Sequence, residues 1–120
     1  MSEPTPPECC EDGLPEPAPL NNEQIARIGK ALGHPARIRI LSNFTECRPL
    51  IVQQIVEECN LAQSTISEHL RILREAELLF ATEDGPRVWY CMRRSVLRSY
   101  AAAVQHLAAD LQPATGPAGG

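Results

Sequence analysis

The sequence lacks long runs of apolar residues, and none approaches the roughly 20 residues that a membrane-spanning helix needs. Its first 20 residues contain no lysine or arginine, which argues against the basic start of a secretory signal. We therefore expect a cytoplasmic protein with no membrane partner, whose thiols stay reduced. In that setting the five cysteines are better interpreted as metal ligands, nucleophiles or core residues than as a disulfide framework.

Positive charge is also scarce, because the 120 residues carry a formal net charge of −4. The deficit is confined to residues 1–20, which hold five acidic residues and no basic one. The remaining residues hold ten acidic and eleven basic side chains, so their net charge is +1. The folded part is therefore neutral to slightly basic, and DNA binding needs only a local basic face.

The chain is long enough for one domain of ordinary size and too short for two. Residues 1–20 contain six of the eleven prolines and are interpreted as a flexible, cysteine-bearing arm. Residues 113–120, PATGPAGG, are interpreted as a disordered tail. The folded domain then spans residues 21–112, and a core that small often gains stability when the protein dimerises.

Hydrophobic spacing predicts five helices and one hairpin in this domain. The expected helices cover residues 21–33, 35–44, 49–60, 62–76 and 95–111, and the hairpin strands cover residues 78–82 and 88–92. The Asp84-Gly85 pair between the two strands is a typical hairpin signal. The turn at residues 60–62 is short enough for a helix-turn-helix unit. The order α-α-α-α-β-β-α predicts a mainly α (α+β) winged helix-turn-helix.

The fourth expected helix carries the polar side chains that point to DNA. Short or amide-bearing side chains near the start of a recognition helix can bond to base edges and phosphates in the major groove. The predicted DNA contacts are Gln63, Ser64, Thr65, Ser67, His69 and Arg71, with Arg87 at the hairpin tip. A solvated helix face is the plain alternative, and Glu68 counts mildly against DNA because it repels phosphates.

Four segments together resemble the ArsR/SmtB family of metal-responsive repressors. They are residues 30–41 (KALGHPARIRIL), 61–70 (LAQSTISEHL), 75–79 (EAELL) and 87–92 (RVWYCM). His34 and Glu77 stand where the family more often has Asp and Gly, which affects capping and turn details. The resemblance spans about residues 22–111. It implies a homodimer built on the first and last helices, which binds double-stranded operator DNA without ligand and releases it when ligand binds.

Cys9 and Cys10 are adjacent in the arm, where no core explains them, and two neighbouring thiolates suit a soft, thiophilic ion. The arm can span about 35–40 Å at full extension, so it can reach the start of the third helix in its own or a partner subunit. Cys47 lies just before that helix and is the best candidate for a third ligand. Cys59 is interpreted as a core residue and Cys91 as an ordinary strand residue.

Two other ligand sets of the family are missing. Ile51 and Gln53 stand where some members have a C-x-C pair, and only His106 and Asp110 are available where zinc or cobalt sensors use four residues of the last helix. The remaining pattern resembles members that sense arsenite with adjacent arm cysteines and one distant cysteine. This resemblance implies As(III), and also Sb(III), as inducer at Cys9, Cys10 and Cys47, with no organic cofactor.

Several alternatives stay open at this point. The same fold could sense Cd(II) or Pb(II), which would favour a fourth ligand such as Cys59, or it could act as a thiol redox switch. A thiol enzyme, such as an arsenate reductase, needs an activated thiolate beside a base or an anion-binding loop. The acidic arm has neither, so we do not expect an enzyme. A pure protein-interaction module would leave the polar side chains of the fourth helix unexplained.

Overall fold

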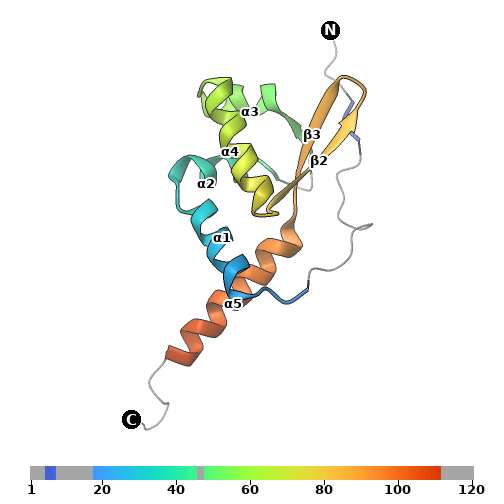
Figure 1. Cartoon of the computed structure of the whole chain (residues 1–120). Coiled ribbons are helices and arrows are strands. Elements are labelled where there is room, and N and C mark those ends of the chain that lie inside the picture. The colour runs from blue at the N-terminus through green and yellow to red at the C-terminus, as the bar shows by residue number, and fades with distance from the viewer. Residues whose placement is uncertain (1–4, 8–17, 46–47, 112–120) are drawn as a thin grey trace.

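The computed structural model describes residues 5–7, 18–45 and 48–111, and it confirms a winged helix-turn-helix (Figure 1). The elements in chain order are α1 (Asn22–Leu32), α2 (Pro35–Leu41), β1 (Leu50–Ile51), α3 (Val52–Cys59), α4 (Gln63–Glu75), β2 (Leu79–Asp84), β3 (Arg87–Met92) and α5 (Arg94–Leu111). All five expected helices and both hairpin strands are present, with ends that differ by a few residues. One strand, β1, was not expected.

The start of α1 follows the predicted capping box. The Asn21 side chain accepts a hydrogen bond from the Gln24 backbone N–H at 2.8 Å, and Gln24 Oε1 accepts one from the Asn21 N–H at 2.9 Å. These two bonds satisfy backbone donors that a helix start otherwise leaves unpaired. The helix then buries Ile28 and Ala31 in the core.

The second helix is shorter than the pattern predicted. Pro35 begins α2 as expected, but the helix ends at Leu41 rather than near Phe44. Ser42 follows as the C-cap, and its hydroxyl donates to the Ile38 carbonyl at 2.9 Å. Phe44 is buried in the core from the loop that follows.

Leu50 and Ile51 form the short strand β1, where a helix starting at Pro49 was expected. They pair with β3 in antiparallel register, Leu50 opposite Tyr90 and Ile51 opposite Trp89. The sheet has the order β1-β3-β2, so β1 joins the wing to the start of α3. The helix begins only at Val52, where the Gln54 side chain accepts a hydrogen bond from the Ile51 N–H at 3.0 Å.

The turn between α3 and α4 is as short as predicted. Asn60 ends α3 in the left-handed conformation, with φ of 57°, and its N–H donates to the Val56 carbonyl at 2.8 Å. Asparagine tolerates this conformation better than most residues. Beyond the turn, α4 packs Ile66, Leu70 and Leu73 into the core, so its other side faces outward.

The wing is a tight hairpin of β2 and β3. Asp84 pairs with Arg87, so the two turn residues are Gly85 and Pro86 rather than the predicted Asp-Gly pair. Gly85 has a φ of +62°, which suits the first position of a two-residue hairpin turn. The tip of the wing and the start of α4 lie at one end of the molecule, and α5 extends toward the other (Figure 1).

Candidate nucleic-acid interface

Five of the six α4 residues that were predicted to contact DNA are exposed. These residues are Gln63, Ser64, Thr65, Ser67 and Arg71. The first four occupy the first five positions of the helix, where a recognition helix presents side chains to base edges. Core packing of Ile66 and Leu70 on the opposite side fixes which way they face.

His69 is the exception, because it is only 8% exposed. Its Nδ1 accepts a hydrogen bond from Arg37 Nε of α2 at 3.2 Å. This burial contradicts the expectation that His69 contacts DNA. The physical reason was available in the sequence, since His69 stands three residues after Ile66 and four before Leu73, on the same helical stripe. The structure therefore assigns His69 to the packing of α4 against α2.

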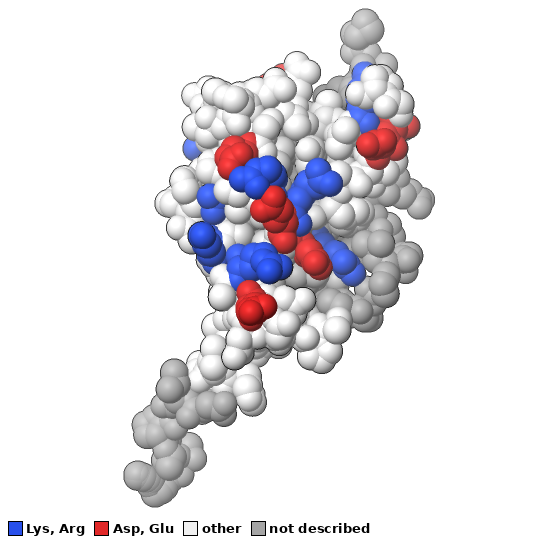
Figure 2. Space-filling model, in the orientation of Figure 1, with Lys and Arg blue, Asp and Glu red and all other residues white. Residues whose placement is uncertain are grey.

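Arg71 is exposed but already engaged by two carboxylates of its own helix. It forms a bidentate ion pair with Glu68. A single further ion pair joins Arg71 Nη1 to Glu75 Oε2 at 2.7 Å. The hydrogen bonds from Arg71 lower the pKa of Glu68, and the two carboxylates raise the pKa of Arg71. Figure 2 shows the resulting band of interleaved basic and acidic side chains over α4 and α1. A DNA phosphate must compete with both carboxylates for this arginine.

The wing offers a second exposed cation. Arg87 opens β3 beside the turn and is exposed, as the sequence predicted. Val88, next to it, is 38% exposed although it is apolar. On the same strand, the Tyr90 ring lies 6.0 Å from the Arg74 guanidinium of α4, a cation–π contact that links the wing to the recognition helix. This contact holds the wing against the C-terminal half of α4.

The three predicted thiolate ligands, Cys9, Cys10 and Cys47, lie outside the described residues. The other two cysteines, Cys59 and Cys91, are buried. Cys59 is a free core thiol, as expected, whereas Cys91 is disulfide-bonded, which contradicts the expectation of reduced thiols and of an ordinary strand residue. Cys59 is 2% exposed, and its sulfur accepts a hydrogen bond from Asn43 Nδ2 at 3.4 Å. Cys91 lies opposite Phe80 in the sheet. Among the described side chains, no three His, Cys, Asp or Glu residues are grouped closely enough to hold a metal ion.

One small cavity brings the arm and the start of α3 together. It has a volume of about 250 Å³ and is lined by Pro6, Arg48, Pro49, Leu50, Gln54, Glu57, Glu58 and Trp89. Pro6 precedes Cys9 by three residues, and Arg48 directly follows Cys47. Trp89 is the only tryptophan of the sequence, and its buried indole N–H has no hydrogen-bond partner among the described residues.

The chain is similar in sequence to known transcriptional regulators. The family model "Bacterial regulatory protein, arsR family" matches residues 34–79. The uncharacterized HTH-type transcriptional regulator MJ1325 of Methanocaldococcus jannaschii is 38% identical over 68 residues, which are 57% of this chain and 76% of that protein. The chain belongs to the arsR family. The regulator CmtR of Mycobacterium tuberculosis is 35% identical over 80 residues, 65% of each chain.

Two further comparisons concern the ligand and the assembly of arsR proteins. The arsenical resistance operon repressor of Staphylococcus aureus is 27% identical over 78 residues, 65% of this chain and 74% of that protein. The homodimeric winged helix-turn-helix DNA-binding domain Mb0332 of Mycobacterium bovis superposes with a TM-score of 0.59, at 27% identity, over 75% of this chain and 83% of that chain.

These relatives and the shared fold are those of DNA-binding transcriptional regulators, not of enzymes. This arsR-family chain is accordingly a transcriptional regulator that binds DNA. None of the helices in its described part has the length and apolarity to cross a membrane.

Proposed function

We propose that this protein is an arsenite-responsive repressor, which binds its operator as a homodimer and leaves it when As(III) binds Cys9, Cys10 and Cys47. Sb(III) has the same three-coordinate thiolate chemistry and is proposed as a second inducer. In the binding step, three thiols replace the three hydroxyls of arsenous acid and release three waters. The contacts with DNA come from Gln63, Ser64, Thr65, Ser67 and Arg71 of α4, with Arg87 on the wing.

An unfilled apolar groove between α1 and α5 supports the homodimer. The groove has a volume of about 690 Å³, and its walls come mainly from Ile25 and Ala26 on one side and Ala103 and Leu107 on the other. Leu107 is 53% exposed and Val104 is 41% exposed, which is unusual for large apolar side chains in a small monomer. The first and last helices of a second copy would cover this surface, and the similar Mb0332 domain is itself described as homodimeric.

The cavity beside Trp89 is the main structural observation in support of the proposed arsenite site. Because Pro6 and Arg48 line the same cavity, the chain needs to span only three residues on one side and one on the other to bring Cys9 and Cys47 together. Three residues reach about 10 Å, which is ample for a shared site. Resemblance to an arsenical resistance operon repressor agrees with a trivalent metalloid as ligand.

The position of β1 gives such a site a route to the DNA-binding surface. Arg48 leads directly into β1, which pairs with β3 of the wing and continues into α3 of the helix-turn-helix. A ligand that fixes the arm onto this segment would change the angle between the wing and α4. If the bound geometry disfavours the spacing of two half-sites, DNA affinity falls by the coupling free energy, and about 3 kcal/mol already exceeds 100-fold.

Titration of the DNA-bound protein with arsenite tests the proposal directly. We expect release of a labelled duplex, selected by the wild-type protein from a random pool, together with a change in the fluorescence of Trp89 beside the site. Cys9→Ser, Cys10→Ser and Cys47→Ser should each keep DNA binding and lose most of the release, because a hydroxyl is a poor substitute for a thiolate. Cys59→Ser is the matched control and should respond like the wild type.

The same titration separates the alternatives. X-ray absorption of the arsenite-bound protein should report three sulfur neighbours. Release by Cd(II) or Pb(II) but not by arsenite would refute the metalloid assignment, and release by peroxide alone would indicate a redox switch. Normal release from Cys47→Ser would show that Cys47 is not the third ligand. Mixed dimers, with Cys9→Ser and Cys10→Ser in one subunit and Cys47→Ser in the other, then decide whether the site lies within or between subunits.

A further inference from the structure

An arginine of α2 joins three helices behind the DNA-binding surface. Arg37 Nε donates to Nδ1 of His69, on α4, at 3.2 Å. Its Nη1 donates to the carbonyl oxygens of Lys30 and Ala31, in the last turn of α1, at 3.3 Å each. Carbonyls at a helix end lack partners within the helix and attract a cation. Arg37 therefore ties the recognition helix to the end of α1.

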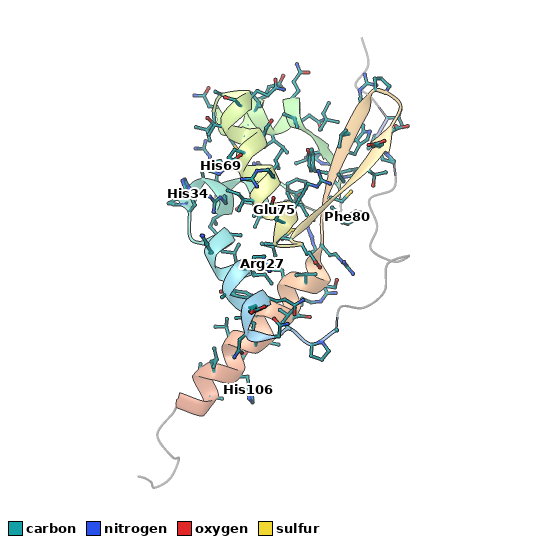
Figure 3. The ribbon with its side chains drawn as sticks, viewed as in Figure 1. Arg27, His34, His69, Glu75, Phe80 and His106 are labelled. Atoms are coloured by element: carbon teal, nitrogen blue, oxygen red, sulfur yellow. The ribbon has the colours of Figure 1, made fainter. Side chains whose placement is uncertain are left out.

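A second histidine packs against the same site. His34 is the N-cap of α2, and its ring centroid lies 4.8 Å from that of His69, with the two rings tilted by 60°. Its own Nδ1 accepts a hydrogen bond from the Ala36 backbone N–H at 3.1 Å. Figure 3 labels both histidines where α2 meets α4. The bond from Arg37 uses Nδ1 of His69 as an acceptor, so it requires the ring of His69 to be neutral.

The surroundings of His69 favour that neutral form. Burial lowers the pKa of His69, and the neighbouring His34 and Arg37 lower it further because each disfavours a positive charge on His69, whereas Glu68 acts in the opposite direction. Glu68 is itself paired with Arg71. From α1 the cluster meets backbone carbonyls, and no charged group in the described parts of α1, α3 or β2 shifts the pKa of this histidine.

We propose that Arg37 and His69 form a clamp that positions the recognition helix, and that proton uptake at His69 opens the clamp and weakens DNA binding. A proton on Nδ1 removes the acceptor of Arg37 and places an imidazolium beside a guanidinium. Repulsion then drives His69 out of its buried position between α2 and α4. Because Gln63 and Ser67 stand on the same rigid helix, the DNA-contacting side chains move with it. The inference rests on DNA binding by this family and not on the arsenite site.

The test compares three proteins by binding to the selected duplex at constant ionic strength, between about pH 8 and about pH 5. The wild type should lose about tenfold in affinity toward the acid end, as expected for one lost charge-assisted hydrogen bond. His69→Asn keeps an acceptor at the place of Nδ1 and cannot take up the proton, so its affinity should match the wild type at about pH 8 and fall less in acid. His69→Leu has no acceptor and should bind about tenfold more weakly throughout.

Two results would overturn the clamp. If DNA affinity depends on pH in the same way in the wild type and in His69→Asn, protonation of His69 does not weaken DNA binding. The shared pH dependence would then come from other groups, which titrate equally in both proteins. Wild-type affinity of a folded His69→Leu at about pH 8 would remove the positioning role. If His69→Leu fails to fold, the His69→Asn comparison still decides. Arg39→Ala controls for lost charge on α2, since Arg39 is exposed on the same helix, whereas Arg37→Ala should reproduce His69→Leu.

Discussion

Glu77 adopts a backbone conformation that a glycine would adopt without strain. Its φ is 64°, in the left-handed region, directly after the last residue of α4 and its cap. The Glu77 N–H donates to the Arg74 carbonyl at 2.8 Å, and the Leu78 N–H donates to the Leu73 carbonyl at 3.0 Å. This is the hydrogen-bond pattern of a Schellman motif, in which glycine is the usual residue at the left-handed position. We therefore predict that Glu77→Gly stabilises the protein.

The expected gain follows from two opposing effects on the backbone. A left-handed residue with a Cβ costs roughly 1–2 kcal/mol, which glycine avoids. Glycine also makes the unfolded chain more flexible, which returns about 0.4–1 kcal/mol. The net stabilisation should be about 1 kcal/mol, which for a domain of this size raises Tm by roughly 4–8 °C. The motif itself stays intact, because Leu73 and Leu78 are fully buried on either side of it.

Urea unfolding followed by circular dichroism measures this gain, with all variants at the same concentration because a dimer's stability depends on it. Glu77→Ala is the decisive control, since it removes the same side chain but keeps the Cβ. Gly85→Ala is the converse test, because Gly85 has a φ of +62° with nothing within 4 Å of an added Cβ, so only backbone strain can destabilise it. If Glu77→Gly is no more stable than Glu77→Ala, the strain argument is wrong.

Three further outcomes are expected. Glu68→Gln should tighten DNA binding a few-fold at low salt and less at high salt, because it frees Arg71 for phosphate and removes a negative charge; unchanged binding in fluorescence anisotropy would contradict this. Val104→Asp should give monomers in light scattering and lose binding to a duplex with two half-sites, and a stable dimer would move the interface elsewhere. Cys59→Ser should lower the free energy of unfolding by about 1–3 kcal/mol through its buried hydroxyl, measured by urea denaturation, while release by arsenite persists.

Local signals in the sequence were sufficient for most of the fold. The capping box at Asn21 and Gln24 set the start of α1, and the left-handed Asn60 ended α3 where the pattern predicted. The exposed face of α4 followed from the spacing of Ile66 and its apolar neighbours. These features depend on residues within one or two turns of each other, so they can be recognised without knowledge of the tertiary structure.

Most of the features that the sequence did not predict depend on contacts between residues far apart in the chain. The strand β1 has only two residues, too few for an alternating pattern, and it exists because β3, about 40 residues later, supplies its hydrogen bonds. Arg37 lies in a segment that resembles the arsR family, yet nothing in the local sequence indicates that its side chain bonds to His69, 32 positions away. The burial of His69, in contrast, follows from the i, i+3, i+4, i+7 spacing of buried positions on α4. It was not predicted because histidine is a polar residue.

The two sides of α4 make the clamp and the sensor depend on each other. On one side α4 packs against α3, which follows the proposed arsenite site through β1, and on the other side Arg37 holds His69. Arsenite can lower the affinity for DNA only by the difference in DNA affinity between the ligand-free and the arsenite-bound arrangements of α4. His69→Leu should therefore lower the affinity of the ligand-free protein more than that of the arsenite-bound protein. The ratio of the two affinities, measured by anisotropy at about pH 8, should shrink relative to the wild type, and an unchanged ratio would show that arsenite acts through the wing alone.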